Sequence, residues 1–306
     1  MADLKLIKQL RELTGCGIAD CNKALTACNN NVEESIDWLR KKGLSAAAKK
    51  SARTAAEGLI GIYSELNKAS MVEVNSETDF VAKNEMFRNF VSDVVITAFN
   101  CDCKKIDDLL KTKYKDSSIS IEEKQSNKIA VIGENINTRR VATLAVKKGI
   151  IATYMHNAIK PGLGKIGVLV GIKSEGDTDK LEEFGKKIAM HIAATKPEAL
   201  QITDVDPVKI KRERTVFAEQ AKNSGKPDNI IDKMIEGRLR KYYEEVVLME
   251  QFFVMDDKKK ISEVVKEFEK ELGLPVSLES FEIFVLGEGV NKKECDFAEE
   301  VASMTK

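Results

Sequence analysis

The sequence predicts an α+β protein, in which helical stretches and strand-rich stretches follow one another along the chain. Three observations carry this prediction. Apolar residues recur at helical spacing over residues 1–45. A strand–strand–helix order then occurs twice, starting near residues 58 and 149. Helical spacing returns over residues 207–247, around a break that contains Gly and Pro.

Residues 1–45 are predicted to form a bundle of three short helices. The apolar faces of these helices consist of Leu6, Leu10 and Leu13, of Ile18, Cys21, Leu25 and Cys28, and of Val32, Ile36 and Leu39. Gly15, Asn29–Asn31 and Gly43 break the pattern after each helix in turn, since Gly and Asn tolerate the conformations that end helices. Trp38 is expected to anchor the bundle. About 40 residues is close to the minimum for an independent core, so docking suits this bundle better than catalysis.

A helical linker is predicted over residues 46–56, which are rich in Ala and Lys. Lys49, Lys50 and Arg53 give it a basic character. Contact with an acidic partner is one interpretation of these charges, but a solvated basic face is the more common one.

Residues 57–145 and 146–286 are predicted to be two related halves of one core. The elements expected in the first half are strands Leu59–Tyr63 and Met71–Val74 and a helix with Phe87, Phe90, Val91, Val94 and Val95 on its apolar side. Those expected in the second half are strands Gly149–Tyr154 and Ile166–Ile172 and a helix over Leu181–Ala194. The two halves share few identical residues, so the duplication rests on the order of their elements.

An antiparallel helical hairpin is predicted to interrupt the second half over about residues 205–248. Ser224–Pro227 lies between its two helices, with Gly placed to stop the first and Pro to start the second. A strand over Ser280–Leu286 is predicted to close the core. The last residues, 287–306, are predicted to form a C-terminal module with a helix over Phe297–Met304.

The composition favours an ordinary globular protein that stays in the compartment where it is made. Lys plus Arg and Asp plus Glu both number 49, and this zero net charge argues against long nucleic acid as the main partner. No apolar run approaches the roughly 20 residues of a membrane helix, and the N-terminus lacks a signal peptide. Cys101 and Cys103 are too closely spaced for a usual zinc site. The six cysteines are expected to be reduced thiols, as is usual in a cytosolic protein.

The patterns typical of enzymes are incomplete in this sequence. His156 and His191 lack the Cys or Ser surroundings of a nucleophile–base pair, and His191 is expected to be a core or interface residue. Residues 161–165 resemble part of a phosphate-binding loop, but Ile159 and Ile166 stand where that loop needs Gly and Ser or Thr. The sequence therefore predicts a binding protein with no cofactor and no metal.

Thr78, Asp79, Phe80 and Val81 are the strongest candidate site. They follow a predicted strand and precede a helix that begins near Ala82, so Thr78 or Asp79 can cap that helix. One interpretation is a plain turn with Phe80 packed into the local core. The other is that Phe80 inserts into a pocket of a partner, where one buried aromatic can dominate binding.

Five groups of residues, in order along the chain, resemble translation elongation factor Ts, the guanine-nucleotide exchange factor of elongation factor Tu. They are Leu10–Gly17 with Asp20–Leu25, Val74–Ala82, Gly133–Asn137 with Arg139 and Arg140, His191–Ala194 with Lys196 and Pro197, and Ser224–Pro227. The resemblance covers nearly the whole chain. It implies that residues 1–45 are a ubiquitin-associated-like (UBA-like) bundle and that the inserted hairpin is a coiled coil.

The resemblance also implies a mechanism and a partner. The turn with Asp79 and Phe80 would enter the nucleotide-binding domain of elongation factor Tu, in its GDP-bound or nucleotide-free form, and displace the supports of Mg²⁺ and phosphate. Secondary contacts would come from Leu10, Arg11, Gly15, Gly17, Ile18 and His156. A dimer of heterodimers is compatible with this resemblance. No membrane or direct nucleic-acid contact is expected, and a bacterial cytoplasmic location is favoured because no transit peptide is present.

Two alternatives and two departures from the family stay open at this point. An RNA or ribosome adaptor would use the basic linker and the hairpin, and an enzyme would need a carboxylate site such as Asp79 with Glu77. The segment 157–165 looks longer than expected, which bears on the contacts near His156. Cys295 replaces a Thr of the closing segment, where Phe297 is expected to be structural.

Overall fold

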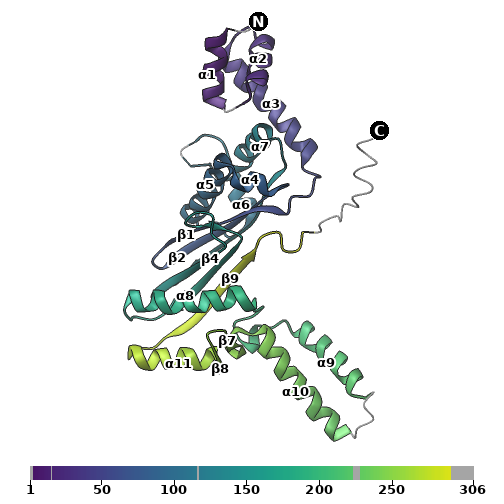
Figure 1. The fold of residues 1–306 in the computed structure, drawn as a ribbon, viewed down its shortest axis with the longest axis vertical. Coiled ribbons are helices and arrows are strands. Elements are labelled where there is room, and N and C mark those ends of the chain that lie inside the picture. The colour runs from purple at the N-terminus through teal and green to yellow at the C-terminus, as the bar shows by residue number, and fades with distance from the viewer. Residues whose placement is uncertain (1–2, 15, 116, 223–227, 291–306) are drawn as a thin grey trace.

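The computed structural model describes residues 3–14, 16–115, 117–222 and 228–290 of the chain. It shows an elongated protein with a helical bundle at one end, two β-sheets in the middle and a pair of helices at the other end (Figure 1). The α+β prediction is confirmed, since helices and antiparallel strands make up most of these residues. None of the helices described is long and apolar enough to cross a membrane.

The bundle consists of α1 (Leu4–Thr14), α2 (Ile18–Ala27) and α3 (Val32–Lys50). Its core contains Ile7, Leu10, Cys21, Ala24, Leu25 and Leu39, against which Trp38 packs. Asn29 and Asn30 adopt positive φ, as expected for the turn before α3. Two residues assigned to the apolar faces are exposed instead of buried: Leu13 is 62% exposed and Ile18 is 57% exposed. That part of the prediction was wrong: Leu13 lies near the end of α1 and Ile18 at the start of α2, where the bundle leaves them largely uncovered.

The prediction that the third helix ends before Gly43 was wrong, and that of a helical linker over residues 46–56 is confirmed only for residues 46–50. Helix α3 continues through Gly43 to Lys50, and residues 51–56 form no helix. Gly43 is buried against Ala130 of α7, so the close approach of the two helices offsets the cost of a Gly inside a helix. Near its C-terminal end, α3 is further held by the Lys50 amine, which donates to the carbonyl of Gly133 (2.6 Å).

The first half of the core has an antiparallel sheet with the strand order β3–β2–β1–β5. Its elements are β1 (Glu57–Glu65), β2 (Lys68–Ser76), α4 (Asp79–Lys83), α5 (Glu85–Cys101), α6 (Ile106–Lys111), α7 (Ile121–Ile132) and β3 (Ile136–Ala145). Helix α5 buries Phe87, Phe90, Val91, Val94 and Val95 against the sheet, as its apolar spacing predicts.

The second half has a three-stranded antiparallel sheet with the order β4–β6–β9. Its elements are β4 (Gly149–His156), β5 (Leu163–Gly164), β6 (Ile166–Lys173), α8 (Thr178–Thr195), a 3₁₀ turn (Ile202–Asp204), a second 3₁₀ turn (Leu248–Glu250), β7 (Phe252–Phe253), β8 (Asp256–Lys260), α11 (Ile261–Leu272) and β9 (Ser277–Val285). Helices α8 and α11 lie over one face of this sheet (Figure 1).

The two halves are joined more closely than a simple duplication requires. Strand β5, from the second half, pairs with Ile60 and Gly61 of β1 and extends the first sheet. Between the two sheets, apolar side chains from both halves form a shared core that includes Met71, Leu169 and Phe284. The sequence gives no sign of this strand exchange, because β5 is two residues long.

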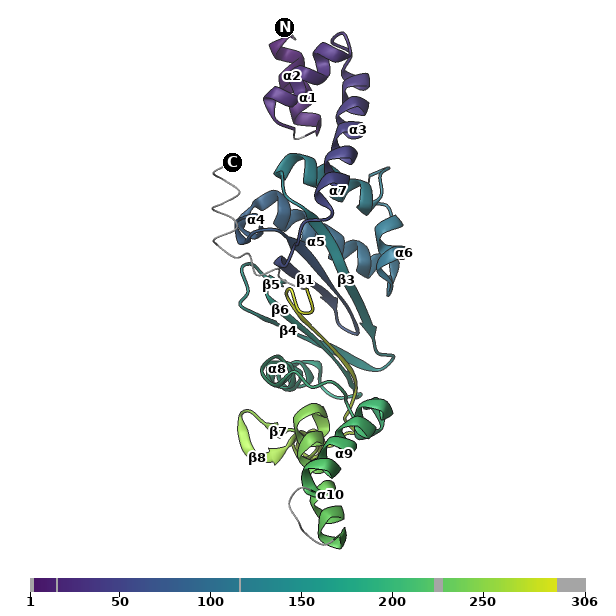
Figure 2. The same cartoon turned by 90° about the vertical axis from the view of Figure 1, so that its right-hand side faces the viewer.

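The insertion in the second half contains α9 (Pro207–Lys222) and α10 (Asp228–Val246). The two helices lie side by side and extend away from the sheets (Figure 2). Phe217 and Ala218 of α9 pack against Ile231, Ile235 and Leu239 of α10. The predicted turn at Ser224–Pro227 and the predicted helix at Phe297–Met304 lie outside the described residues.

The prediction of reduced thiols was wrong for one pair of cysteines. Cys101 and Cys103 form a disulfide, whereas Cys16, Cys21 and Cys28 are free. Asp102 adopts the left-handed conformation (φ 53°) at the end of α5, and the tight turn that results brings the two cysteines together. Cys295 lies outside the residues that the structure covers.

A fully buried carboxylate, that of Glu73 on β2, connects the two halves. Its oxygens accept hydrogen bonds from Arg139 Nη1 (3.1 Å to each) and form an ion pair with Arg140. They also accept from Asn75 Nδ2 and from the Gly287 N–H, both at 2.9 Å. Because Gly287 follows β9, this carboxylate ties the end of the second sheet to the centre of the first.

His191 is a core residue, as predicted, and its protonation is fixed by its neighbours. It is fully buried on α8. The Val254 N–H lies 3.3 Å from its Nδ1, which therefore accepts, and Nε2 donates to Gln251 Oε1 at 3.0 Å. Burial lowers the pKa of His191 below the ordinary value of 6.5.

Replacing Glu73 should strongly destabilise the protein. In Glu73→Gln, two partly buried guanidinium groups lose their countercharge, so we expect the free energy of unfolding to fall by about 3 kcal/mol. Urea denaturation followed by circular dichroism measures this. As a control, Glu175→Gln removes an exposed ion pair with Lys148 and should leave the unfolding free energy nearly unchanged. Equal midpoints for the two variants would contradict the role given to Glu73.

The depressed pKa of His191 should make stability fall in mild acid. Above about pH 6.5 the imidazole is neutral in both states; below it the unfolded chain takes up the proton first, so the unfolding free energy decreases. We expect the loss between pH 7.5 and 5.5 to be smaller in His191→Gln than in the parent protein. Parallel pH profiles for the parent and His191→Gln would refute this assignment.

Candidate partner-binding site

Phe80 protrudes from the protein surface although the two residues that follow it are buried. Its side chain is 74% exposed, whereas Val81 and Ala82 are buried in the core of the first half. The interpretation of Phe80 as part of the local core is therefore wrong, since Val81 and Ala82 occupy that position. A large exposed aromatic on an anchored turn is a feature of binding surfaces.

The turn before Phe80 is held by the side chain of Glu134, which follows α7. One oxygen of Glu134 accepts from the backbone N–H of Thr78 (2.9 Å) and the other from the Thr78 hydroxyl (2.7 Å). A second carboxylate joins the same two segments the other way round, because Glu77, next to Thr78, accepts from the N–H of Asn135, next to Glu134. Glu77 also forms an ion pair with Arg53 (3.5 Å). We call these contacts the Glu77–Glu134 clamp. It fixes the backbone from which Phe80 projects.

The predicted helix cap at Thr78 or Asp79 was wrong. Thr78 is the residue before α4, but its side chain makes no bond to the first turn of that helix, because its hydroxyl donates to Glu134. The neighbouring helix α5 does have a side-chain cap, in which Asn84 Oδ1 accepts from the Met86 N–H (2.8 Å).

Charged side chains flank the exposed ring. Asp79 accepts from the Lys83 amine at 3.0 Å, one helical turn away, and this hydrogen bond lowers the pKa of Asp79. The Lys83 amine also lies 5.4 Å from the centre of the Phe80 ring. The site therefore presents an aromatic ring beside an exposed ion pair. Because an exposed ion pair contributes little free energy, Asp79 and Lys83 can replace their mutual contact with contacts to a partner at little energetic cost.

The remaining candidate residues differ in exposure. Arg11, Gly17 and Ile18 are exposed on the bundle, whereas Leu10 is fully buried and supports the bundle from within. Gly15 lies outside the described residues. His156 is exposed at the end of β4, where its Nδ1 lies 3.0 Å from the Tyr154 hydroxyl.

The separate parts of the candidate surface lie along one side of the molecule. In Figure 2, α1, α4 and the connection from β4 to β5 all lie on the left. Lys165, whose N–H donates to the His156 carbonyl (3.3 Å), also contributes to the lowered pKa of Asp79. The bundle, the turn with Phe80 and the end of β4 can therefore face one large partner together.

Sequence reasoning missed the residues that position the turn. Glu134 and Thr78 are 56 residues apart, and nothing in their local patterns links them. Residues 133–137 were singled out only through a family resemblance, which gave them no structural role.

These observations describe a projecting aromatic ring on a fixed turn, an arrangement typical of proteins that bind other macromolecules. A family model described as "Elongation factor TS" matches residues 77–288. The curated elongation factor Ts of Rhodospirillum centenum is 54% identical over 299 residues, which cover 98% of this chain and 97% of that protein. The factor of Rhodospirillum rubrum is 52% identical over 302 residues, and that of Bartonella bacilliformis is 49% identical over 300 residues. Each of these matches covers 98% of this chain and 97% of the relative.

The chain therefore belongs to the elongation factor Ts family, which confirms the resemblance seen in its sequence. Its role is that of an elongation factor in protein biosynthesis.

Loss of the clamp should loosen the turn without unfolding the core. In Glu134→Ala we expect the Thr78 amide to exchange with solvent about tenfold faster, because it loses a hydrogen bond to a charged group. Hydrogen exchange followed by NMR measures this rate. The matched control is Glu122→Ala, which removes an exposed carboxylate from α7. Unchanged exchange at Thr78 in Glu134→Ala would contradict the clamp.

Proposed function

We propose that this chain is a guanine-nucleotide exchange factor that binds elongation factor Tu carrying GDP and promotes release of the nucleotide. The observation that carries the proposal is the 74% exposed Phe80 ring on a clamped turn, in a chain that belongs to the elongation factor Ts family. The chain acts as a binding protein in this proposal, with no cofactor and no chemical step of its own.

The proposed mechanism uses Phe80 as a wedge. The ring enters the nucleotide-binding domain of the partner and shifts the groups that support Mg²⁺ and the GDP phosphates. GDP then dissociates faster, and GTP replaces it by mass action. Binding linkage makes the effect reciprocal, so a factor that weakens nucleotide binding is itself released when nucleotide binds.

The four residues of the turn have different tasks in this mechanism. The ring of Phe80 inserts into the partner. The carboxylate of Asp79 becomes available to the partner when its hydrogen bond from Lys83 breaks. Thr78 donates two hydrogen bonds to Glu134 of the clamp, and the buried side chain of Val81 anchors the turn in the core. Rigidity matters because a ring on a loose turn would lose conformational freedom on binding, and less of its binding energy would act on the partner.

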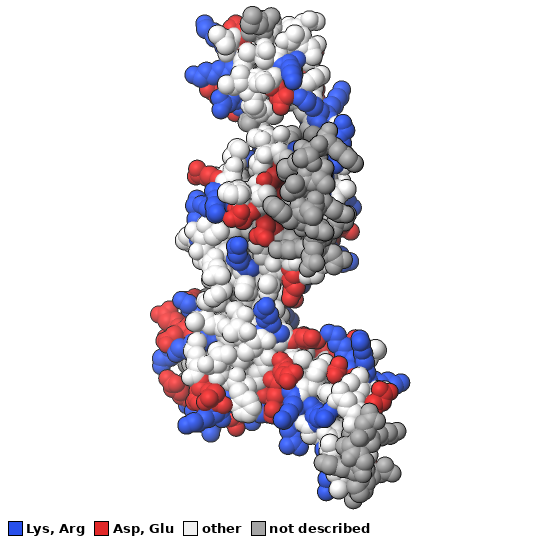
Figure 3. Space-filling view, turned by 45° about the vertical axis from the view of Figure 1, so that its right-hand side comes forward, with Lys and Arg blue, Asp and Glu red and all other residues white. Residues whose placement is uncertain are grey.

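Secondary contacts enlarge the proposed interface on both sides of the wedge. Arg11, Gly17 and Ile18 on the bundle contact the same domain of the partner, and His156 contacts another domain. The mixed surface charge gives no support to the alternative of an RNA adaptor, since Lys and Arg alternate with Asp and Glu over the face in Figure 3. The proposal includes the bacterial cytoplasm as the location.

Truncating Phe80 should remove most of the exchange activity. We expect Phe80→Ala to slow factor-stimulated GDP release at least tenfold, and Asp79→Ala to slow it less, because the ring makes the intrusion. Release of fluorescent GDP from purified elongation factor Tu measures both. Leu66→Ala is the matched control, since Leu66 is also a large exposed apolar residue (58%) but lies at the β1–β2 turn. Full activity in Phe80→Ala would overturn the wedge.

A further inference from the structure

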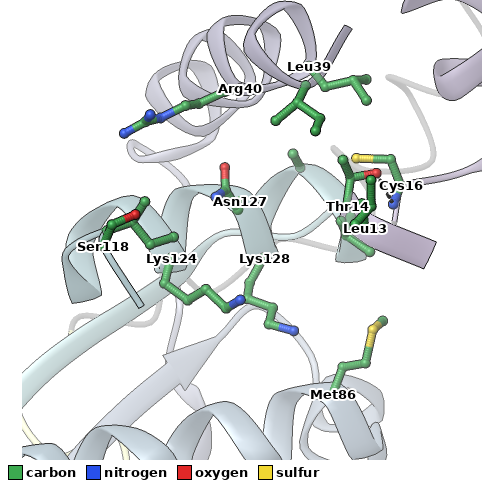
Figure 4. Close-up of a pocket in the computed structure, with 14 residues that line it drawn as sticks. Leu13, Thr14, Cys16, Leu39, Arg40, Met86, Ser118, Lys124, Asn127 and Lys128 are labelled. Atoms are coloured by element: carbon green, nitrogen blue, oxygen red, sulfur yellow. Dashed lines mark hydrogen bonds between the residues drawn. The ribbon is translucent and has the colours of Figure 1, made fainter. Parts of the chain in front are cut away.

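A cavity of about 370 Å³ lies where the N-terminal bundle meets the first half of the core. Its walls come from α1, α3, the start of α5 and the segment from residue 118 through α7 (Figure 4). The large apolar residues of the lining are Leu13, Ile36, Leu39, Met86, Ile119 and Val131. Two of these side chains are unusually open to solvent, Leu13 at 62% and Met86 at 39%. We call this space the bundle–core cavity.

The charged residues that line the cavity are all basic. They are Arg40, Lys124 and Lys128, and no Asp or Glu is found among the lining residues that the structure describes. Arg40 is neutralised by its ion pair with Glu123. Within the described part of the chain, neither lysine has a carboxylate within ion-pair distance, and Lys124 instead lies 5.1 Å from the centre of the Tyr114 ring.

The two lysines share one wall of the cavity. They lie one turn apart on α7, and Figure 4 shows both side chains on the side of α7 that faces Met86. Burial, and then the charge of Lys124, lower the pKa of Lys128. The carboxylate that acts on Lys128 is that of Asp93, which is already engaged by the Tyr114 hydroxyl and the Lys115 amine (3.2 Å). The cavity thus carries uncompensated positive charge beside an apolar wall.

We propose that the bundle–core cavity binds a small amphipathic anion, with its carboxylate between Lys124 and Lys128 and its aliphatic body against Leu13, Ile36 and Met86. The volume falls in the range of small-molecule sites, and the basic lining selects a negative head group. A bound anion also relieves the repulsion between two neighbouring ammonium groups.

Binding at this place has a structural consequence. The cavity is lined by Leu13 and Ile36 from the bundle and by Met86 and Lys128 from the core. A ligand that contacts both sides holds the bundle at one orientation relative to the core. The site is separate from the turn with Phe80, and its existence does not depend on the exchange activity proposed above.

Octanoate and its neutral analogue octanol test the proposal on the full-length protein. With ¹³C-methyl-labelled Met, we expect octanoate to shift the Met86 methyl signal saturably and to bind more tightly than octanol. The double variant Lys124→Gln/Lys128→Gln should weaken octanoate binding about tenfold and leave octanol binding unchanged. Lys111→Gln, which removes an exposed lysine from the end of α6, is the control and should bind octanoate normally.

A second variant keeps the test decisive if the double lysine variant folds poorly. Leu13→Asp places a negative charge at an exposed position of the lining and should also weaken octanoate binding. The proposal is overturned if octanol binds the parent protein as tightly as octanoate. It is equally overturned if octanoate binding is not saturable, leaves Met86 unshifted, or is insensitive to these substitutions.

Discussion

The contact on which the rest of the structure depends is the buried carboxylate of Glu73. It lies in the central part of the first sheet, and it compensates two arginines from β3 while receiving the N–H of Gly287 beyond β9. A buried charge is tolerated only where its oxygens are satisfied, and here four neighbouring residues satisfy them. The position of β2 is thereby fixed relative to β3 and to the end of the second sheet. The turn with Phe80 follows directly from β2, so its orientation derives from this contact.

A fixed scaffold and an exposed aromatic side chain complement each other in this fold. The clamp by Glu134 and the burial of Val81 leave the backbone of the turn little freedom, whereas the ring of Phe80 stays in water. Exposing an aromatic ring costs hydrophobic free energy in the isolated protein. That free energy becomes available when the ring enters a partner, which is how one residue can dominate an interface.

The sequence predicts local elements well and their mutual contacts poorly. The strands β1, β2, β4, β6 and β9 and the helices α5 and α8 follow from apolar spacing. Strand β3 and the helices α7 and α11 were not predicted. Gly43 was expected to end a helix, but packing against Ala130 outweighs its intrinsic preference. Phe80 was recognised as a candidate, and its exposure could not be deduced, since Val81 is equally apolar. Glu134 was missed because hydrogen bonds between distant segments leave no periodic signal.

The two-residue strand β5 has a consequence for how the molecule can be divided. The chain order suggests two modules separable near residue 146, yet β5 from the second half pairs with Ile60 and Gly61 of the first. Cutting the chain there would leave the backbone of β1 with unpaired hydrogen-bonding groups at a sheet edge, a template for association with other chains. The similar order of elements in the two halves therefore does not make them separable, because the β1–β5 pairing and the shared core join them.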